Sequence, residues 1–247
     1  MIKFLEVIPR RPDLTHAYFL EHLSTKHLEV VDLVPEFRNR VRRYVQTHLY
    51  VEPAELSCIQ GTTFRPDADA LIEVWFDTIG EVFAAFQEPR YFSIIRPDEH
   101  AFGDVAGAWG LPIHETIITE RPGFAGLIRL FIFLRRSDAL SHASFQERWR
   151  EFRDRRLLTT GAFRACIGRF VENWVSQDPA EAIPGMKPYD LIAQFGLNTL
   201  SDVGTFTADP AVRQLIAATA QDLFAPGPGV YLGRGNPAAT EWLEKVK

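Results

Sequence analysis

Cysteine is scarce in this sequence: the 247 residues include two, Cys58 and Cys166. They form no CxxC pair and no other spacing typical of metal ligands, which excludes a zinc-stapled or disulfide-rich scaffold. Isolated cysteines of this kind are common as small apolar residues in reducing compartments. We therefore expect a cytoplasmic protein in which both thiols are free.

Long apolar runs and an excess of basic charge are also missing. Residues 1–11 carry charges at Lys3 and Glu6, unlike the apolar stretch of a signal peptide. No run approaches the ~20 apolar residues that a membrane-spanning helix needs. The formal net charge is −5, so nothing points to a nucleic-acid partner. We expect neither a membrane nor a nucleic acid as partner, and a small molecule as substrate.

Motifs for cofactors and metals are missing too. The sequence has no P-loop, no HExxH and no GxGxxG after a predicted strand. Two glycine-rich stretches, 102–112 and 225–235, lead into predicted strands rather than into helix N-termini, so they are typical of loops. We therefore expect no cofactor and no metal.

What the sequence does contain is an internal repeat. The segment IKFLEVIPRR from Ile2 resembles IRLFIFLRRS from Ile128, 126 residues later. LIEVWFDTI from Leu71 pairs with IAQFGLNTL from Ile192 at a spacing of 121, and the change of spacing falls within 51–70, where loop residues prevail. We predict a tandem duplication with modules 1–121 and 122–247, the second ending in an added helix over 238–247.

Each module shows the order β-α-β-β-α-β, which predicts an α+β fold built from two ferredoxin-like units. In the first module we predict strands over 2–8, 41–51, 71–76 and 113–119, and helices over 15–34 and 77–87. The helices of such a unit cover one face of its sheet, so the other face needs a partner. We expect the second unit to supply it, which gives a dimeric α/β-barrel arrangement within one chain. The protein would then be a pseudo-dimeric monomer or a homodimer.

Alternation along the strands locates a candidate site. Tyr44, Gln46, His48 and Tyr50 share one face of the second strand. The opposite face is apolar: Val41, Val45 and Leu49. We expect the apolar face to pack on the helices and the polar face to line the barrel. On the third strand Glu73 and Trp75 share a face, and we expect them to join Tyr44 and His48 across the hairpin.

Several motifs of the first half resemble one family. They are RRPDLTHAYF from Arg10, a helix that carries His27, RYVQTH from Arg43, EVWF from Glu73, Pro89-x-Tyr91 and DEHAF from Asp98. Together they look like the EthD-like family of the dimeric α/β-barrel superfamily. The resemblance implies that His27 reaches the pocket. The chain departs from the family at Leu23, where a tryptophan is usual; the second half keeps that residue as Trp149, but has Arg153 in place of His27 and Trp174 in place of His48.

A histidine paired with a carboxylate suits acid–base catalysis near neutral pH. We predict His27, His48 and Glu73 as catalytic residues. The predicted substrate-binding residues are Tyr44, Gln46, Tyr50, Trp75, Trp149, Arg153 and Trp174. Structural roles remain open as well: a histidine in a strand is often a hydrogen-bonded core residue, and an ion pair with Arg42, Arg43 or Lys26 would explain Glu73.

The expected function is a cofactor-independent enzyme acting on a small oxygenated molecule, aromatic or polyketide-like. The reaction would be that of a lyase (dehydratase or decarboxylase) or of an isomerase or cyclase. The resemblance also implies two alternatives, because the superfamily includes monooxygenases and haem-binding enzymes. One is a haem-binding or oxygen-using monooxygenase-like enzyme, and the other is a non-catalytic small-molecule-binding protein.

Overall fold

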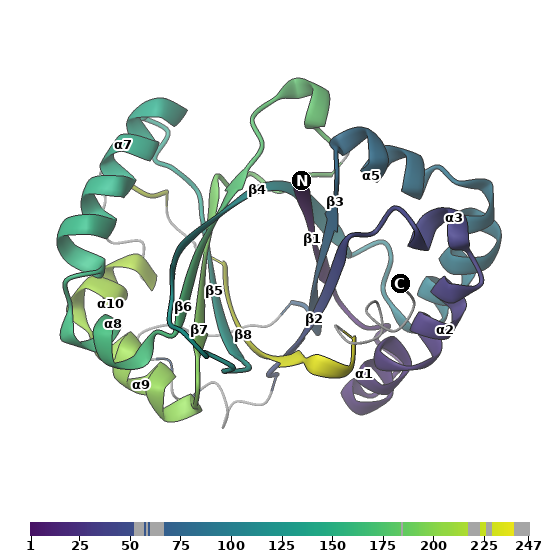
Figure 1. Ribbon diagram of the computed structural model, residues 1–247, viewed down its shortest axis with the longest axis horizontal. Helices are drawn as coiled ribbons and strands as arrows, with labels where there is room; N and C mark the ends of the chain where they lie inside the picture. The colour runs from purple at the N-terminus through teal and green to yellow at the C-terminus, as the bar shows by residue number, and fades with distance from the viewer. Residues whose placement is uncertain are drawn as a thin grey trace.

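The chain folds into a closed barrel of eight antiparallel strands with helices on its outside (Figure 1). The computed structural model describes residues 1–51, 57, 59, 67–183, 185–216, 223–225 and 229–239. The strands are β1 (Ile2–Ile8), β2 (Arg43–Leu49), β3 (Ala70–Phe76), β4 (Trp109–Glu120), β5 (Ile128–Leu134), β6 (Arg169–Val175), β7 (Leu191–Leu197) and β8 (Gly229–Asn236). Their order around the barrel is β1-β3-β2-β8-β5-β7-β6-β4. The predicted α+β class and the barrel are therefore confirmed.

The two halves of the chain contribute the same strand order. The first half supplies β4-β1-β3-β2 and the second β8-β5-β7-β6, and they join through the pairs β2–β8 and β4–β6. A pair of side chains repeats as well. The Arg10 backbone N–H donates to Asp69 at 2.8 Å, and the Arg136 backbone N–H donates to Asp190 at 2.9 Å. The side chain of Arg10 also forms an ion pair with Asp69, and the side chain of Arg136 forms one with Asp190.

Two groups of helices cover opposite sides of the barrel (Figure 1). The first consists of α1 (His16–Ser24), α2 (Lys26–Asp32), α3 (Pro35–Arg38), α5 (Ile79–Phe86), the π-helical turn η1 (Tyr91–Ile95) and α6 (Arg96–Phe102). The second consists of α7 (His142–Phe152), the π-helical turn η2 (Arg153–Leu157), α8 (Gly161–Cys166), α9 (Leu200–Ala208) and α10 (Pro210–Ile216). The 3₁₀ turn η3 (Pro179–Glu181) lies in the connection between β6 and β7, apart from both groups (Figure 1). Among the described residues, no helix is both long enough and apolar enough to cross a membrane.

Local chemistry explains where the first helices begin and end. Thr15 caps α1, because its Oγ1 accepts a hydrogen bond from the Tyr18 N–H at 3.2 Å, and Ser141 caps α7 in the same way. The helix predicted over 15–34 is in fact two helices. Ser24 and Thr25 donate their hydroxyls to backbone carbonyls one turn earlier, and Thr25 leaves the helical conformation. The new start at Lys26 sets the direction of α2, which carries His27.

Three apolar clusters make up the core. One lies between the first-half strands and their helices, one between the second-half strands and theirs, and one inside the barrel. The barrel cluster occupies one end of the interior, with residues such as Leu71, Phe131 and Phe133 fully buried. Cys166 is a free, buried thiol in the second-half core, whereas Cys58 lies outside the described residues.

The structure corrects the predicted orientation of β2. Residues directly opposite each other in an antiparallel pair share a face. Tyr44 lies opposite Val74 and Gln46 opposite Ile72, so this face packs on the helices, whereas Val45 lies opposite Glu73. Tyr44, Gln46 and His48 therefore point outward, and the alternate positions, with Leu49 in the barrel cluster, point inward. Alternation separates the two faces of a strand but does not say which face is inward when both are buried.

Candidate functional site

A cavity of about 390 Å³ lies between the outer face of the first-half strands and the helices α2, α5 and α6. Its walls are mainly aliphatic and aromatic, including Phe4, Leu23, Phe37, Val74 and Phe86. Gly110 of β4 contributes to the space, because a Cβ there would lie 2.5 Å from the Phe4 ring. A largely apolar cavity of this size with a few converging polar groups is typical of a small-molecule site.

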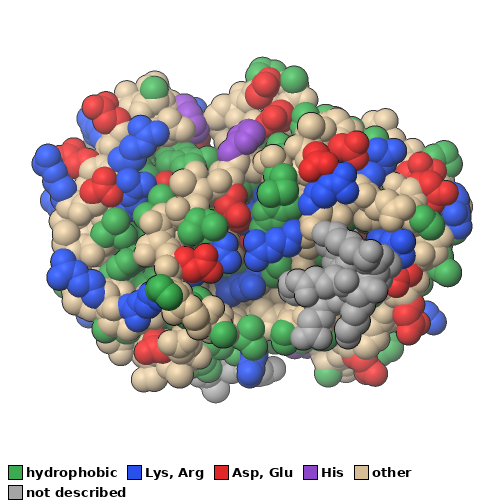
Figure 2. Space-filling view, in the orientation of Figure 1, with side chains coloured by type: hydrophobic (Ala, Val, Ile, Leu, Met, Phe, Trp, Pro, Cys, Tyr) green, Lys and Arg blue, Asp and Glu red, His purple; other side chains and the backbone are tan. Residues whose placement is uncertain are grey.

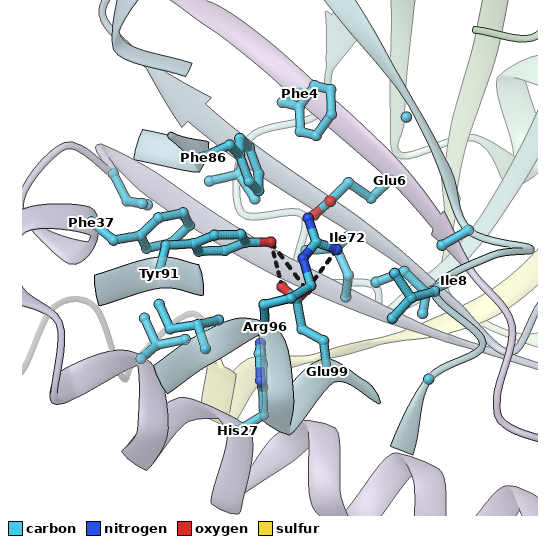
Figure 3. A pocket seen from close by; sticks show the side chains of 18 of the residues that line it. Phe4, Glu6, Ile8, His27, Phe37, Ile72, Phe86, Tyr91, Arg96 and Glu99 are labelled. Carbon is cyan, nitrogen blue, oxygen red and sulfur yellow. Dashed lines mark hydrogen bonds and ion pairs between the residues drawn. The ribbon is translucent and has the colours of Figure 1, made fainter. Parts of the chain in front are cut away.

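The polar groups of this cavity gather on one side (Figure 3). Tyr91 donates its hydroxyl to the Glu99 carboxylate, at 2.8 Å from Oε1 and 3.0 Å from Oε2. Arg96 Nη1 lies 3.0 Å from Glu99 Oε2, and the guanidinium lies 5.1 Å from the centre of the Tyr91 ring. In Figure 3 these three side chains meet in the middle of the group, with Glu6 on one side and His27 on the other. The π-helical turn η1 carries Tyr91, and such turns are frequent at functional sites.

Both carboxyl groups in the cavity bind protons more tightly than usual. Burial, reinforced by the charge of Glu99, raises the pKa of Glu6 to about 8. Burial also raises the pKa of Glu99, although Arg96 opposes the effect. The pKa values of Tyr44 and Tyr91 are raised by burial as well. At neutral pH the cavity therefore contains a protonated carboxyl group at Glu6 and two phenols that stay neutral.

His27 is held in one orientation by a carboxylate outside the cavity wall. Asp98 accepts from His27 Nδ1 through Oδ2 and from His22 Nε2 through Oδ1, each at 2.8 Å. Burial favours the neutral form of Asp98, but the hydrogen bonds from His27 and His22 outweigh it and lower the pKa of this carboxyl. An ionised carboxylate only accepts hydrogen bonds, so Nδ1 of His27 carries a proton. In the neutral imidazole the other nitrogen, Nε2, is then the acceptor.

Two predicted site residues, His27 and Tyr44, do line this cavity. His48 belongs to a neighbouring hydrogen-bond network. Its Nε2 lies 3.2 Å from both Ser24 Oγ and Gln46 Oε1, and burial lowers its pKa to about 4. Gln46 donates to the Leu23 carbonyl at 2.9 Å and to the Tyr44 hydroxyl at 3.1 Å. These contacts suit structural roles for His48 and Gln46, with Gln46 fixing the Tyr44 hydroxyl.

Glu73 and Trp75 are not part of the cavity, because they point into the barrel. Glu73 Oε1 lies 2.8 Å from Lys3 Nζ, and Oε2 lies 3.0 Å from Arg129 Nη1. Burial alone would raise the pKa of Glu73, but Lys3 and Arg129 lower it. The predicted group of Glu73 and Trp75 with Tyr44 and His48 is therefore wrong: the sheet separates the two pairs. An ion pair was the alternative interpretation of Glu73, although its partners are Lys3 and Arg129 rather than Lys26 or Arg42.

The corresponding layer of the second half is filled. Glu172, at the position of Gln46, accepts from Trp149 Nε1 at 2.5 Å and from Arg153 Nη1 at 2.9 Å. Trp174 Nε1 donates to the same carboxylate at 3.2 Å. Trp149 is fully buried, and Tyr50 packs at the edge of this second-half cluster. Trp149, Arg153 and Trp174 therefore lie close together, at the positions that correspond to Leu23, His27 and His48 of the first half. They surround the structural carboxylate of Glu172 and do not line the first-half cavity.

Sequence reasoning missed four polar residues of the cavity: Glu6, Tyr91, Arg96 and Glu99. Tyr91 and Glu99 were visible in the P-x-Y and D-E-x-x-F motifs, although neither was assigned a role. Glu6 was noted only as a charge within a strand. Its opposite neighbours, Ile72 and Gly110, show that it belongs to the helix-facing side.

The match to a protein-family model covers the segment that builds this cavity. Residues 11–106 match the model of the EthD domain. This segment of the chain is therefore similar to the EthD domain. The match begins before α1 and ends after α6, so the EthD domain includes His27, Tyr91, Asp98 and Glu99, while Glu6 on β1 precedes it. A search of the curated proteins finds no match to the chain.

Solved structures with a similar fold extend over both halves. A candidate monooxygenase from Fusobacterium nucleatum is similar with a TM-score of 0.54 at 7% identity, over 95% of this chain and 91% of that one. A candidate chlorite dismutase is similar with a TM-score of 0.55 at 10% identity, over the full length of both chains. Chlorite dismutase from Candidatus Nitrospira defluvii, in complex with imidazole, gives 0.52 at 15% identity, over 99% and 94%. At these identities the likeness establishes the fold, which the EthD domain shares with them.

Proposed function

We propose that the first-half cavity is the active site of an oxygen-using, monooxygenase-like enzyme for a small, largely apolar substrate with an acidic C–H or O–H group. The observation that carries the proposal is the pairing of an oriented imidazole, His27, with carboxyl groups of raised pKa, Glu6 and Glu99, in one apolar cavity. Candidate monooxygenases among the structures of similar fold support the oxygen-using reaction. Nothing among the comparisons supports a lyase or isomerase, which was the first expectation.

The aromatic and aliphatic walls would hold the apolar part of the substrate. Phe4, Phe37 and Phe86 offer ring faces and edges to a flat aromatic molecule. The oxygen atoms of the substrate would lie on the polar side, within reach of Arg96 and the Tyr91 hydroxyl (Figure 3). Arg96 would stabilise negative charge that develops there, because a cation in a water-poor cavity acts more strongly than in water.

His27 would act as the base. With Nδ1–H donated to Asp98, its Nε2 accepts a proton from a substrate CH₂ group next to an oxygenated ring, and Asp98 stabilises the resulting imidazolium. The electron pair left on carbon adds to O₂, and the protonated Glu6 donates to the distal oxygen, which forms a hydroperoxide. The Glu6 carboxylate then removes the second C–H proton and the O–O bond breaks. The hydroxide that leaves takes the proton held by His27 and becomes water. The balance is CH₂ + O₂ → C=O + H₂O, in which the substrate supplies the electrons.

Haem, which some members of the superfamily bind, fits these residues poorly. His27 does have the carboxylate partner that orients a haem-ligating histidine. However, Tyr91, Arg96 and Glu99 occupy the space beside it (Figure 3). Arg96 is the one Lys or Arg side chain among the described residues that line the cavity, so at most one of the two haem carboxylates would have a counter-charge there. No step of the proposed reaction therefore involves haem.

Oxygen uptake tests this function. Purified protein would be given a panel of small phenols and anthrone-like tricyclic compounds in an oxygen-electrode chamber, and the product analysed after reaction under ¹⁸O₂. We expect oxygen uptake with one ¹⁸O atom in the product and one in water, with the same rate after metal chelation. Turnover without oxygen uptake would instead support the lyase or isomerase reaction. Saturable substrate binding with no turnover would support a binding protein, and a Soret band on addition of haem would contradict the haem argument.

We also propose that the modules 1–121 and 122–247 descend from one duplicated ferredoxin-like unit. The shared strand order and the repeated pairs Arg10–Asp69 and Arg136–Asp190 support this origin. A protease site inserted after Arg121 tests the division. We expect the cleaved halves to stay associated through β2–β8 and β4–β6, whereas fragments that separate as folded monomers would contradict it.

A further inference from the structure

The barrel has a second, charged pocket at the end opposite its apolar cluster. This pocket measures about 180 Å³ and is lined by both halves of the chain and by the linker between them. Its charged lining residues are Arg43, Glu73, Glu115, Glu120, Arg129 and Arg169. Figure 2 looks onto the barrel, and basic and acidic side chains gather where the surface is hollowed between the two halves.

Arginine and lysine occupy equivalent positions of the two halves here. Lys3 corresponds to Arg129, and Arg43 corresponds to Arg169, each 126 residues apart. Lys3 is fully buried and is neutralised by Glu73 at 2.8 Å and by Glu115. Both halves of the barrel thus supply a pair of cations to one small space.

The carboxylate that balances this charge is present in one half alone. Glu73 of β3 corresponds to Gln194 of β7, which donates its own side-chain N–H to Glu73 at 3.3 Å. Glu73 is therefore shared among Lys3, Arg129 and Gln194. The second half contributes its two arginines without the matching acid.

Arg169 shows the consequence most clearly. Its nearest described carboxylate is Glu120, whose closest oxygen lies 3.9 Å from Nη1 and which is 46% exposed. The Arg169 Nε atom is buried and has no hydrogen-bond partner among the described residues. A buried donor without a partner destabilises the fold, and a charged one more than a neutral one, so a bound acceptor would relieve this cost. Burial also lowers the pKa of Arg129, and the charges of Arg43 and Arg169 act in the same direction.

We infer that this barrel pocket binds a small oxyanion, a carboxylate or a phosphate, between Arg129 and Arg169, at the place where a glutamate at position 194 would have put its charge. The pocket presents N–H donors, which match oxyanion acceptors. Arg43 also lines the pocket, and its guanidinium lies 4.5 Å from the centre of the Trp75 ring. The site is separate from the first-half cavity and does not depend on the proposed oxygen chemistry.

Titration calorimetry on the full chain tests the inference, with sodium phosphate, acetate and succinate as separate probes at ionic strength held constant with NaCl. We expect one saturable site for at least one probe, and the tightest probe identifies phosphate or carboxylate as the chemistry selected. Arg169→Gln should weaken binding about 10–100-fold, as expected for loss of a charge-assisted hydrogen bond. Arg155→Gln, on an exposed arginine paired with Glu151, is the matched control and should bind as the unaltered protein does.

Gln194→Glu provides a second test of the inference. This variant places in the second half a carboxylate equivalent to Glu73, and it removes no arginine. We expect this variant to bind none of the three probes and to melt at a higher temperature than the parent protein in probe-free buffer. Absence of saturable heat for all three probes up to about 10 mM in the parent protein would overturn the inference. So would a Gln194→Glu variant that binds the probes as tightly as the parent.

Discussion

The two halves of the barrel share a strand order but differ in the layer between sheet and helices. The second half fills this layer with Trp149, Phe145 and Phe152, and the buried carboxylate of Glu172 accepts hydrogen bonds from Trp149, Arg153 and Trp174. The first half has Leu23 where the second has Trp149, and it encloses a cavity with two carboxyl groups of raised pKa. The exchange of a large residue for a smaller one at this position is one of several differences between the filled layer and the cavity.

The difference extends to the positions that line the first-half cavity. In the first half His27, Glu6 and Tyr44 line open space, while the equivalent positions of the second half carry Arg153, Ile132 and Phe170. Ile132 and Phe170 are completely buried, so the second half has apolar side chains at positions where the first half has groups that are costly to bury without a partner. The following predictions test this difference between the two halves.

The largest expected effect concerns His27. His27→Ala should lower turnover about 10²–10⁴-fold, the usual contribution of a general base. Arg153→Ala is the matched variant in the second half and should leave turnover within about twofold. Steady-state rates of oxygen uptake measure both. Equal losses in the two variants would mean that the halves share one site.

Trp149→Leu and Leu23→Trp exchange the side chains of equivalent positions. We expect the first to affect the free energy of unfolding and the second to affect substrate binding. Trp149→Leu should lower the free energy of unfolding by about 2–4 kcal/mol, because it leaves a cavity and removes a hydrogen bond to Glu172. Leu23→Trp should instead fill the first-half cavity and abolish substrate binding, with a change in stability of less than about 2 kcal/mol. Urea unfolding and substrate titration distinguish the two. Undiminished substrate binding in Leu23→Trp would exclude the cavity as the site.

A further effect, on the pH dependence of stability, is expected from Glu6, whose equivalent in the second half is Ile132. Because the folded-state pKa of Glu6, about 8, exceeds the unfolded value of about 4.3, the folded protein binds the proton more tightly. Its contribution is complete below pH 4.3 and is lost as the pH rises toward 8, by at most about 1.4 kcal/mol per pH unit.

Glu6→Gln should therefore flatten the decline in stability between pH 5 and 8. Urea midpoints at several pH values measure this slope, with Glu151→Gln on the exposed surface as the control. A slope in Glu6→Gln equal to that of the parent protein would show that Glu6 ionises normally.

The smallest effect concerns the thiols, which do not occupy equivalent positions. Cys166 should react slowly with a thiol reagent in the folded protein, because it is buried and burial raises its pKa. Unfolding without reductant should release two titratable thiols, Cys58 and Cys166. A titration of zero would reveal a disulfide.

The fold was predictable because its signals are periodic and occur twice. Strand alternation, the caps at Thr15 and Ser141, and the repeat at 126 residues all point to the same order of elements. The site was less predictable, because every residue of β3 is buried and alternation alone cannot say which face meets the helices. The pairing of Tyr44 with Val74 decides it, and that pairing is a long-range contact. His27 was found through its family motif, whereas Glu6 gave no signal apart from its charge.

Closure of the ring has a consequence for how this protein unfolds. All eight strands have a neighbour on both sides, so no strand presents a free edge to another molecule. The two halves meet at two seams, β2–β8 and β4–β6, and neither half can open without breaking both. Amide hydrogen exchange in the central strands should therefore report a single cooperative opening for the whole ring. The second half therefore contributes directly to the lifetime of the folded state that contains the first-half cavity.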